Sequence, residues 1–198
     1  MKKWIAGIWL AVLTLTIASF FWFNQLVYSM PTPVPDNYKN VENGTKISTG
    51  SKLQFATNKP VFLHFFNPDC PCSRFNITHF KKLVKNYGDS LNFAIVIMSH
   101  KGYTAKDIQT RFGLYIPVVQ DDNLAKTCGV YSTPQAVLLT SDKTLYFRGN
   151  YNKDRYCSDE KTSYAKLAIE ELLQHKKSAN IEPLALLAYG CKLPNCTN

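Results

Sequence analysis

The feature that most constrains this chain is an uncharged, mostly apolar run from Trp4 to Phe23. A helix that spans a membrane needs about 20 predominantly apolar residues, and this run supplies them. The run ends in Phe20-Phe21-Trp22-Phe23, which is typical of an aromatic belt at a membrane interface. We therefore predict one transmembrane helix within residues 1–29, retained as a signal-anchor.

Lys2 and Lys3 precede this run and favour a cytoplasmic N-terminus, because lysine and arginine are enriched on that side. The sequence thus predicts a single-pass protein of the bacterial inner membrane whose domain faces the periplasm. A cleaved signal peptide is the alternative, since Val27-Tyr28-Ser29 fits a cleavage site.

Beyond the anchor, the chain is long enough for one domain of ordinary size. Alternating prolines at 31, 33 and 35 favour an extended spacer. We therefore expect a linker over residues 30–52, a domain over 53–177 and a cysteine-containing extension over 178–198. The net charge is +9, but no arginine-rich run interleaved with aromatics occurs, so no nucleic-acid partner is expected.

Short apolar segments rich in β-branched and aromatic residues alternate with segments of helical periodicity. Expected strands are 60–66, 91–98, 116–120, 135–140 and 144–148, and expected helices are 73–87, 104–112, a short one capped by Asp122, and 163–175. Strands alternating with helices, followed by a hairpin, indicate an α/β fold.

The chain has six cysteines, an even number that suits an oxidising compartment. Cys70 follows the turn Asn67-Pro68-Asp69 and lies where a buried strand gives way to a helix. Amides at a helix N-terminus stabilise a thiolate, which is the nucleophilic form of cysteine. Pro71 suits a first-turn position, and Arg74 adds positive charge one turn along, whereas Asp69 acts in the opposite sense.

The stretch from Val61 to Cys70 (VFLHFFNPDC) resembles the strand that leads to the active site of thioredoxin-like proteins. It is most similar to the redoxin-like branch, near membrane-anchored periplasmic thioredoxins and the alkyl hydroperoxide reductase/thiol-specific antioxidant (AhpC-TSA) group. Thr133-Pro134 resembles the cis-proline loop of that family, and residues 145–149 resemble the hairpin strand that follows it. Tyr189-Gly190-Cys191 resembles the Gly-Cys ending of some redoxin-like proteins.

The resemblance implies a thioredoxin-like fold with a central mixed sheet flanked by helices. Cys70 falls on the exposed nucleophilic cysteine of the family. Pro134 falls on its cis-proline, which leaves the backbone of Thr133 free to pair with a substrate strand. His64 falls where these proteins often hold a buried acid, which implies a proton shuttle near neutral pH. A core histidine with a purely structural role is the alternative.

This chain departs from the family's usual Cys-X-X-Cys pattern. Ser73 occupies the position of the second cysteine, and the nearest other thiol is Cys72. A Cys70–Cys72 bridge requires a non-helical turn, since side chains two apart on a helix diverge. Cys72 or a distal cysteine is therefore expected to resolve Cys70. Structural bridges of Cys157 with Cys191 or Cys196 are also expected, with a relay role as the alternative, and Cys128 is expected to be a buried thiol.

The function that follows is an enzyme, a thiol–disulfide oxidoreductase acting as oxidase, isomerase or reductase on periplasmic protein thiols, with an unspecified redox partner and no cofactor. One alternative is a copper chaperone with Cys70 and Cys72 as ligands, because thiolates suit Cu(I). Another is a thiol peroxidase, although Leu63 and Asn67 replace the Pro and Thr of the peroxiredoxin motif. The last alternative is a redox-inactive scaffold that keeps the fold.

Overall fold

The computed structural model describes residues 2–23, 30–50, 52–153, 160–179 and 182–192, and the chain divides into two compact units, Met1–Pro31 and Thr32–Asn198. In the first unit, helix α1 (Lys2–Phe21) exposes all its side chains. By length and composition α1 is able to cross a membrane.

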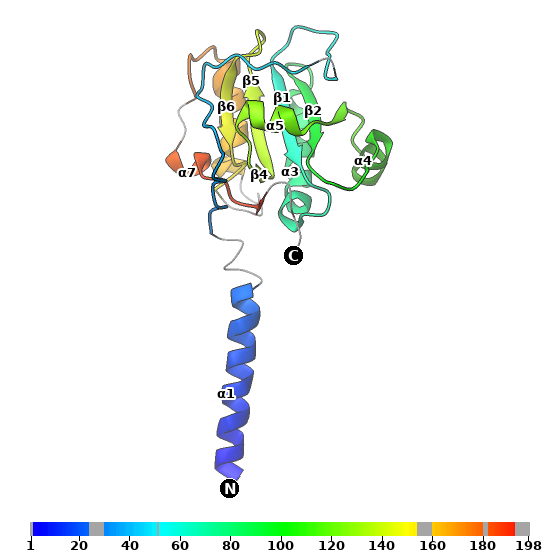
Figure 1. Ribbon diagram of the computed structural model, residues 1–198. Helices are drawn as coiled ribbons and strands as arrows, with labels where there is room; N and C mark the ends of the chain where they lie inside the picture. Colours follow the sequence, from blue (N-terminus) through cyan, green and yellow to red (C-terminus); the bar gives the residue numbers. More distant parts are fainter. Residues whose placement is uncertain (1, 24–29, 51, 154–159, 180–181, 193–198) are drawn as a thin grey trace. The chain divides into compact units, whose positions relative to one another are not determined.

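In the second unit, the main sheet has the strand order β3-β2-β1-β5-β6 (Figure 1). The bounds are β1 (Val61–Phe66), β2 (Asn92–Ile97), β3 (Val118–Gln120), β5 (Gln135–Leu139) and β6 (Leu145–Gly149). Strands β1, β2 and β3 run parallel, whereas β5 is antiparallel to both β1 and β6. A second, two-stranded sheet pairs β4 (Ser132–Thr133) with β7 (Cys191–Lys192).

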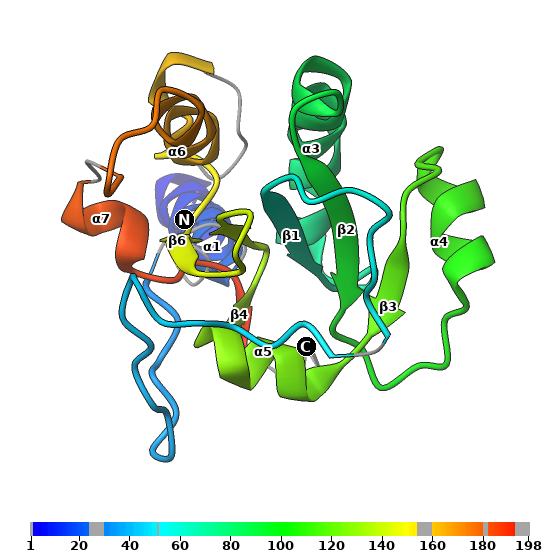
Figure 2. The same ribbon diagram turned by 90° about the horizontal axis from the view of Figure 1, so that it is seen from above.

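The helices cover both faces of the main sheet. They are α3 (Pro71–Tyr87), α4 (Ala105–Phe112), α5 (Asp122–Cys128), α6 (Tyr164–Leu173) and α7 (Pro183–Leu186), with a 3-10 turn over Glu160–Thr162. Figure 2 shows α3 and α6 along one face and α5 along the other. The expected mixed α/β sheet flanked by helices is therefore confirmed.

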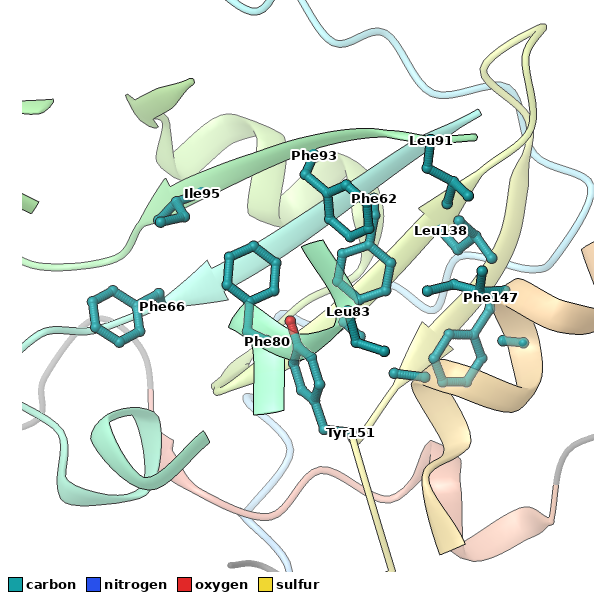
Figure 3. Packing of buried hydrophobic residues seen from close by; sticks show 14 of the residues in the cluster. Phe62, Phe66, Phe80, Leu83, Leu91, Phe93, Ile95, Leu138, Phe147 and Tyr151 are labelled. Carbon is teal, nitrogen blue, oxygen red and sulfur yellow. The ribbon is translucent and has the colours of Figure 1, made fainter. Parts of the chain in front are cut away.

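Successive side chains of β1 enter opposite layers of the core, because a strand alternates its side chains between the two faces of a sheet. Phe62 and Phe66 join Phe80 of α3 in the larger cluster (Figure 3). Leu63 and Phe65 join the cluster beneath α5. Burial on both faces explains why β1 is apolar at every position except His64, and the strand leads directly to the turn before Cys70.

Two local features differ from the sequence expectations. The N-cap of α5 is Asp121 rather than Asp122, and its carboxylate accepts hydrogen bonds from the backbone N–H groups of Asn123 and Leu124. The stretch expected as a linker (30–52) is folded in part, because Ile47 is buried in the core and Lys46 forms a β-bridge with Thr144.

Candidate active site

Cys70 is the N-cap of α3, directly after β1 and the turn that follows it. The Asn67 carboxamide accepts a hydrogen bond from the backbone N–H of Asp69 at 2.9 Å, and the N–H of Cys70 donates to the Asn67 carbonyl at 3.1 Å. The Ser73 hydroxyl accepts from the backbone N–H of Asn67, which ties the first turn of α3 to the end of β1. Pro71 opens the helix, as expected from its lack of an N–H. The junction therefore places Cys70 at the positive end of a long helix.

Asp69 introduces a negative charge beside Cys70. Burial by itself raises the pKa of the Asp69 carboxyl. Hydrogen bonds from Tyr103 and Lys101, with a smaller contribution from Ser99, outweigh burial, so the pKa lies below its usual value. The Tyr103 hydroxyl donates at 2.8 Å and the Lys101 ammonium at 3.2 Å. The carboxylate stays ionised and is turned toward these donors, and Lys101 offsets part of its charge.

The loop before β5 lies against Cys70. The Thr133–Pro134 peptide bond is cis, which confirms the expectation for Pro134. The Cys70 Sγ lies 3.8 Å from the carbonyl oxygen of Thr133. The structure thus brings together two segments that are separated by more than 60 residues of sequence.

Cys70 forms a disulfide bond with Cys191, 121 residues away, with a Cα–Cα distance of 6.3 Å. Of the two partners expected from the sequence, the structure therefore has a distal cysteine rather than Cys72. It also differs from the expected structural bridge between Cys191 and Cys157. Cys157 and Cys196 themselves lie outside the described residues.

Cys72 is a buried, reduced cysteine on the first turn of α3, with 6% of its surface exposed. The sulfur atoms of Cys70, Cys72 and Cys191 all lie within 4.8 Å of one another. The site is therefore a cluster of three sulfurs, two oxidised and one reduced. Such proximity permits exchange of the disulfide among the three, by attack of a thiolate on a neighbouring S–S bond.

The C-terminal segment covers Cys70 and changes two further expectations. Cys70 is fully buried instead of exposed, and Thr133 is not free, because it pairs with Cys191 in the antiparallel β4–β7 ladder. Ser132 pairs with Lys192, and the Ser132 hydroxyl donates to the Cys191 carbonyl at 3.2 Å. The physical reason is that the tail returns to the domain and adds a strand at the position expected for a substrate.

His64 is fully buried in an aromatic cage on β1. Its ring stacks on Phe80 with a centroid distance of 4.3 Å, and its Nδ1 is hydrogen-bonded to the Tyr151 hydroxyl at 2.5 Å. Burial lowers the pKa of His64 from 6.5 to about 3. The imidazole is therefore neutral at physiological pH, which disfavours the expected shuttle through a charged imidazole and favours the alternative of a core histidine.

Arg74 and Cys128 are the remaining two residues singled out from the sequence. The Arg74 side chain is exposed to solvent on α3. Cys128 is a fully buried thiol on α5, and burial raises its pKa to about 12, so it remains protonated and inert. The role expected for Arg74 stays a prediction, and the geometry of Cys128 matches the expected buried thiol.

The sequence reasoning did not identify the residues that bring the tail to Cys70. Thr32 donates its backbone N–H to the Ala188 carbonyl at 2.7 Å, and its hydroxyl donates to the Gly190 carbonyl at 3.2 Å. The side-chain carbonyl of Asn150 accepts from the backbone N–H of Tyr189 at 3.3 Å. The one sequence signal for this arrangement was the Gly190-Cys191 pair.

Two solved structures match most of the chain. A hypothetical protein, SMc02350, from Sinorhizobium meliloti 1021 is 15% identical, with a TM-score of 0.64 over 79% of this chain and 96% of that chain. An uncharacterized conserved protein from Geobacillus kaustophilus is 12% identical, with a TM-score of 0.60 over 82% of this chain and 97% of that chain. A thiol-disulfide oxidoreductase from Bacteroides fragilis NCTC 9343 matches less well, at 17% identity and a TM-score of 0.42 over 46% of this chain and 72% of that chain.

The mixed sheet, the cysteine at the end of β1 and the cis-proline loop before β5 confirm the expected thioredoxin-like fold. The narrower resemblance to the AhpC-TSA group stays a prediction. A search of curated proteins found no match to this chain. A family model described as "Domain of unknown function (DUF6436)" matches residues 39–194, and the chain belongs to that family.

Proposed function

We propose that this chain is a thiol–disulfide oxidoreductase in which Cys70 and Cys191 exchange electrons with protein thiols. The observation that carries the proposal is the Cys70–Cys191 disulfide, placed at the N-terminus of α3 and against the cis Thr133–Pro134 loop. A disulfide in that position meets helix amides that stabilise the Cys70 thiolate when the bond opens. Cys70 is thus the better leaving group when the mixed disulfide with a substrate is resolved and, once reduced, the better nucleophile.

The reaction balances as a simple exchange. A substrate thiolate attacks the sulfur of Cys70, the Cys70–Cys191 bond breaks, and Cys191 leaves as a thiolate that takes up a proton. A second substrate thiol then attacks the mixed disulfide, which releases oxidised substrate and reduced Cys70. The reverse sequence reduces a substrate disulfide and restores the bond between Cys70 and Cys191. The reduction potential of the pair relative to that of its compartment sets the direction.

The test uses the full chain, oxidised and purified in detergent, with reduced ribonuclease as the thiol substrate. We expect substrate thiols to disappear while the Cys70–Cys191 bond is lost, as followed by thiol titration and by mass spectrometry of the non-reduced protein. Cys70→Ser is expected to abolish the exchange, whereas Cys128→Ser is the matched control because that thiol is buried and protonated. Exchange by Cys70→Ser at the wild-type rate would contradict the proposal.

We further propose that α1 anchors the chain in the bacterial inner membrane and that the second unit works in the periplasm. Support comes from the length and apolar composition of α1 and from the lysines that precede the apolar run. An oxidising compartment also suits a persistent disulfide.

A second candidate function is the binding of a soft metal ion such as Cu(I). The three sulfurs within 4.8 Å of one another favour it, because thiolates are preferred ligands of soft cations. The disulfide must first be reduced, so metal binding and the disulfide exclude each other. A Cu(I) titration of the reduced chain against a competing chelator is expected to show binding that Cys72→Ser weakens and Cys128→Ser does not. Equal binding by both variants would exclude the three-sulfur site.

A further inference from the structure

The C-terminal segment Ala188–Cys191 is held by polar contacts with two parts of the domain. Thr32 contacts the carbonyls of Ala188 and Gly190. Ser132 and Thr133 pair with β7, and the Thr32 and Ser132 hydroxyls hydrogen-bond to each other at 3.0 Å. These contacts involve mainly the backbone of the segment, so they place few demands on its side chains.

The geometry of this pairing is that of a strand added to a short edge. When an extended peptide adds to an edge strand, main-chain hydrogen bonds supply affinity and the alternate side chains supply specificity. Here the pairing places Cys191 opposite Thr133 and brings its sulfur to Cys70. Any extended polypeptide that paired with β4 in this register would present its own cysteine to Cys70.

Gly190 shows what such a polypeptide must carry before its cysteine. Its φ is +149°, a conformation that residues with side chains rarely adopt. A Cβ at this position would lie 2.1 Å from the Thr133 carbonyl oxygen and 2.9 Å from the carbonyl carbon. Both atoms belong to the backbone beside the cis-proline, so they cannot move aside as the end of a flexible side chain does. Glycine is therefore required at this position.

Resting on the proposed exchange function, we propose that residues 189–191 are an internal substrate that fills a polypeptide-binding site, and that this site selects extended chains with a Gly-Cys pair. Cys70 is fully buried and the tail occupies the β4 edge beside it, so a substrate strand pairs with β4 only by displacing the tail. In the oxidised chain, the substrate thiolate attacks Cys70, and Cys191 departs with the electron pair of the broken bond and gains a proton. The tail thus sets both the specificity of the site and its access.

The test uses the full chain carrying Cys191→Ser, in which Cys70 is reduced and the tail is retained. The probe is the peptide Ala-Tyr-Gly-Cys-Lys-Leu, whose cysteine is joined by a disulfide to 5-thio-2-nitrobenzoate. Attack by the Cys70 thiolate forms the Cys70–peptide disulfide and releases the yellow thiolate, which is followed by absorbance. Peptide mapping assigns the adduct to Cys70.

The matched probe has alanine in place of glycine. We expect its reaction rate to be lower by a factor of about ten or more, because forcing an extra methyl group against fixed atoms is costly. Equal rates for the two peptides would overturn the inference. So would a lack of reaction with both peptides in a protein whose Cys70 still reacts with 5,5'-dithiobis(2-nitrobenzoate). A Cys70 that fails to react even with that small disulfide would instead overturn the proposed function.

A second measurement leaves the peptides out. In the otherwise unchanged chain, Gly190→Ala is expected to shift the Cys70–Cys191 pair toward the reduced form in a glutathione redox buffer, by about tenfold in the equilibrium constant. Gly102→Ala is the control, because no atom lies within 4 Å of a Cβ there and its φ is not positive. Identical equilibria for the two variants would contradict the role given to Gly190.

Discussion

At the scale of single residues, His64 shows how burial overrides the chemistry that a residue type suggests. Its ring is fully buried among Phe66, Phe80 and Tyr151, and its Nε2 has no hydrogen-bond partner among the described residues. A charged imidazole there would lose its hydration without gaining a compensating partner, so the neutral form is strongly favoured. Burial of this residue therefore links folding stability to pH, and the proton-shuttle role expected for it stays a prediction.

We predict that His64 makes the folded domain sensitive to acid. Its pKa is about 3 when folded and 6.5 when unfolded, so the unfolded state binds the proton more tightly. The stability that the neutral, buried His64 contributes is fully present above the unfolded-state pKa of 6.5. It is lost as the pH falls from 6.5 toward the folded-state pKa of about 3. Between pH 7 and pH 5 the loss from this residue amounts to about 2 kcal/mol.

The measurement is urea unfolding of the full chain at pH 7 and pH 5. His64→Gln is expected to be less stable at pH 7 but to lose the part of the pH dependence that His64 supplies. The same substitution at the exposed His175 serves as the control and is expected to keep the wild-type slope. An unchanged slope for His64→Gln would show that other groups carry the acid sensitivity.

At the scale of elements, the N-cap of α6 connects that helix to α3. The Ser163 hydroxyl accepts from the backbone N–H of Lys166 at 3.2 Å and lies 2.8 Å from the Nε2 of His79. It also lies 3.3 Å from the carbonyl oxygen of Tyr151, so one buried hydroxyl joins two helices and the segment after β6. Both helices cover the same face of the sheet (Figure 2).

Ser163→Ala is therefore expected to lower the free energy of unfolding by about 1–2 kcal/mol, because it removes a helix cap and leaves buried groups without their partner. Chemical denaturation of the full chain measures the change. Ser90→Ala, at an exposed position after α3, is expected to alter stability by only a few tenths of a kcal/mol. Similar losses for the two variants would refute the linking role of Ser163.

At the scale of the whole molecule, the two units are suited to different surroundings. The side chains of α1 are exposed and, after Lys2 and Lys3, mostly apolar, whereas the second unit buries its apolar residues in two layers. An exposed apolar helix of this length is stable only in contact with a lipid phase or a partner. The proposed anchor accounts for that composition.

We predict that the full chain stays with the membrane fraction after alkaline carbonate extraction, and that a version lacking residues 1–29 is released. A periplasm-dependent reporter such as alkaline phosphatase, fused to the C-terminus, is expected to be active. N-terminal sequencing of the mature protein separates the two interpretations of the segment. A mature chain beginning near Ser29 would replace the anchor by a cleaved signal peptide.

Local patterns were sufficient to predict most of the elements near the site. The apolar run of β1, the turn at Asn67 and the proline at the first position of α3 are all adjacent in sequence, so their effect on Cys70 was readable without a structure. The cis bond before Pro134 was likewise predicted from its neighbours, through the family resemblance. The two short strands β4 and β7 were not predicted, because two residues each carry no periodicity.

The sequence alone determined the position of Cys70, since a strand, a turn and a helix start are encoded over a few adjacent residues. Only the tertiary structure decided its partner and its burial. The Cys70–Cys191 bond joins residues 121 positions apart. It depends on contacts of the tail with Thr32, Asn150 and Thr133, which no local sequence pattern predicts. Long-range pairing depends on how the elements pack around one core, and that packing also turned the expected open substrate site into one that is filled by the chain itself.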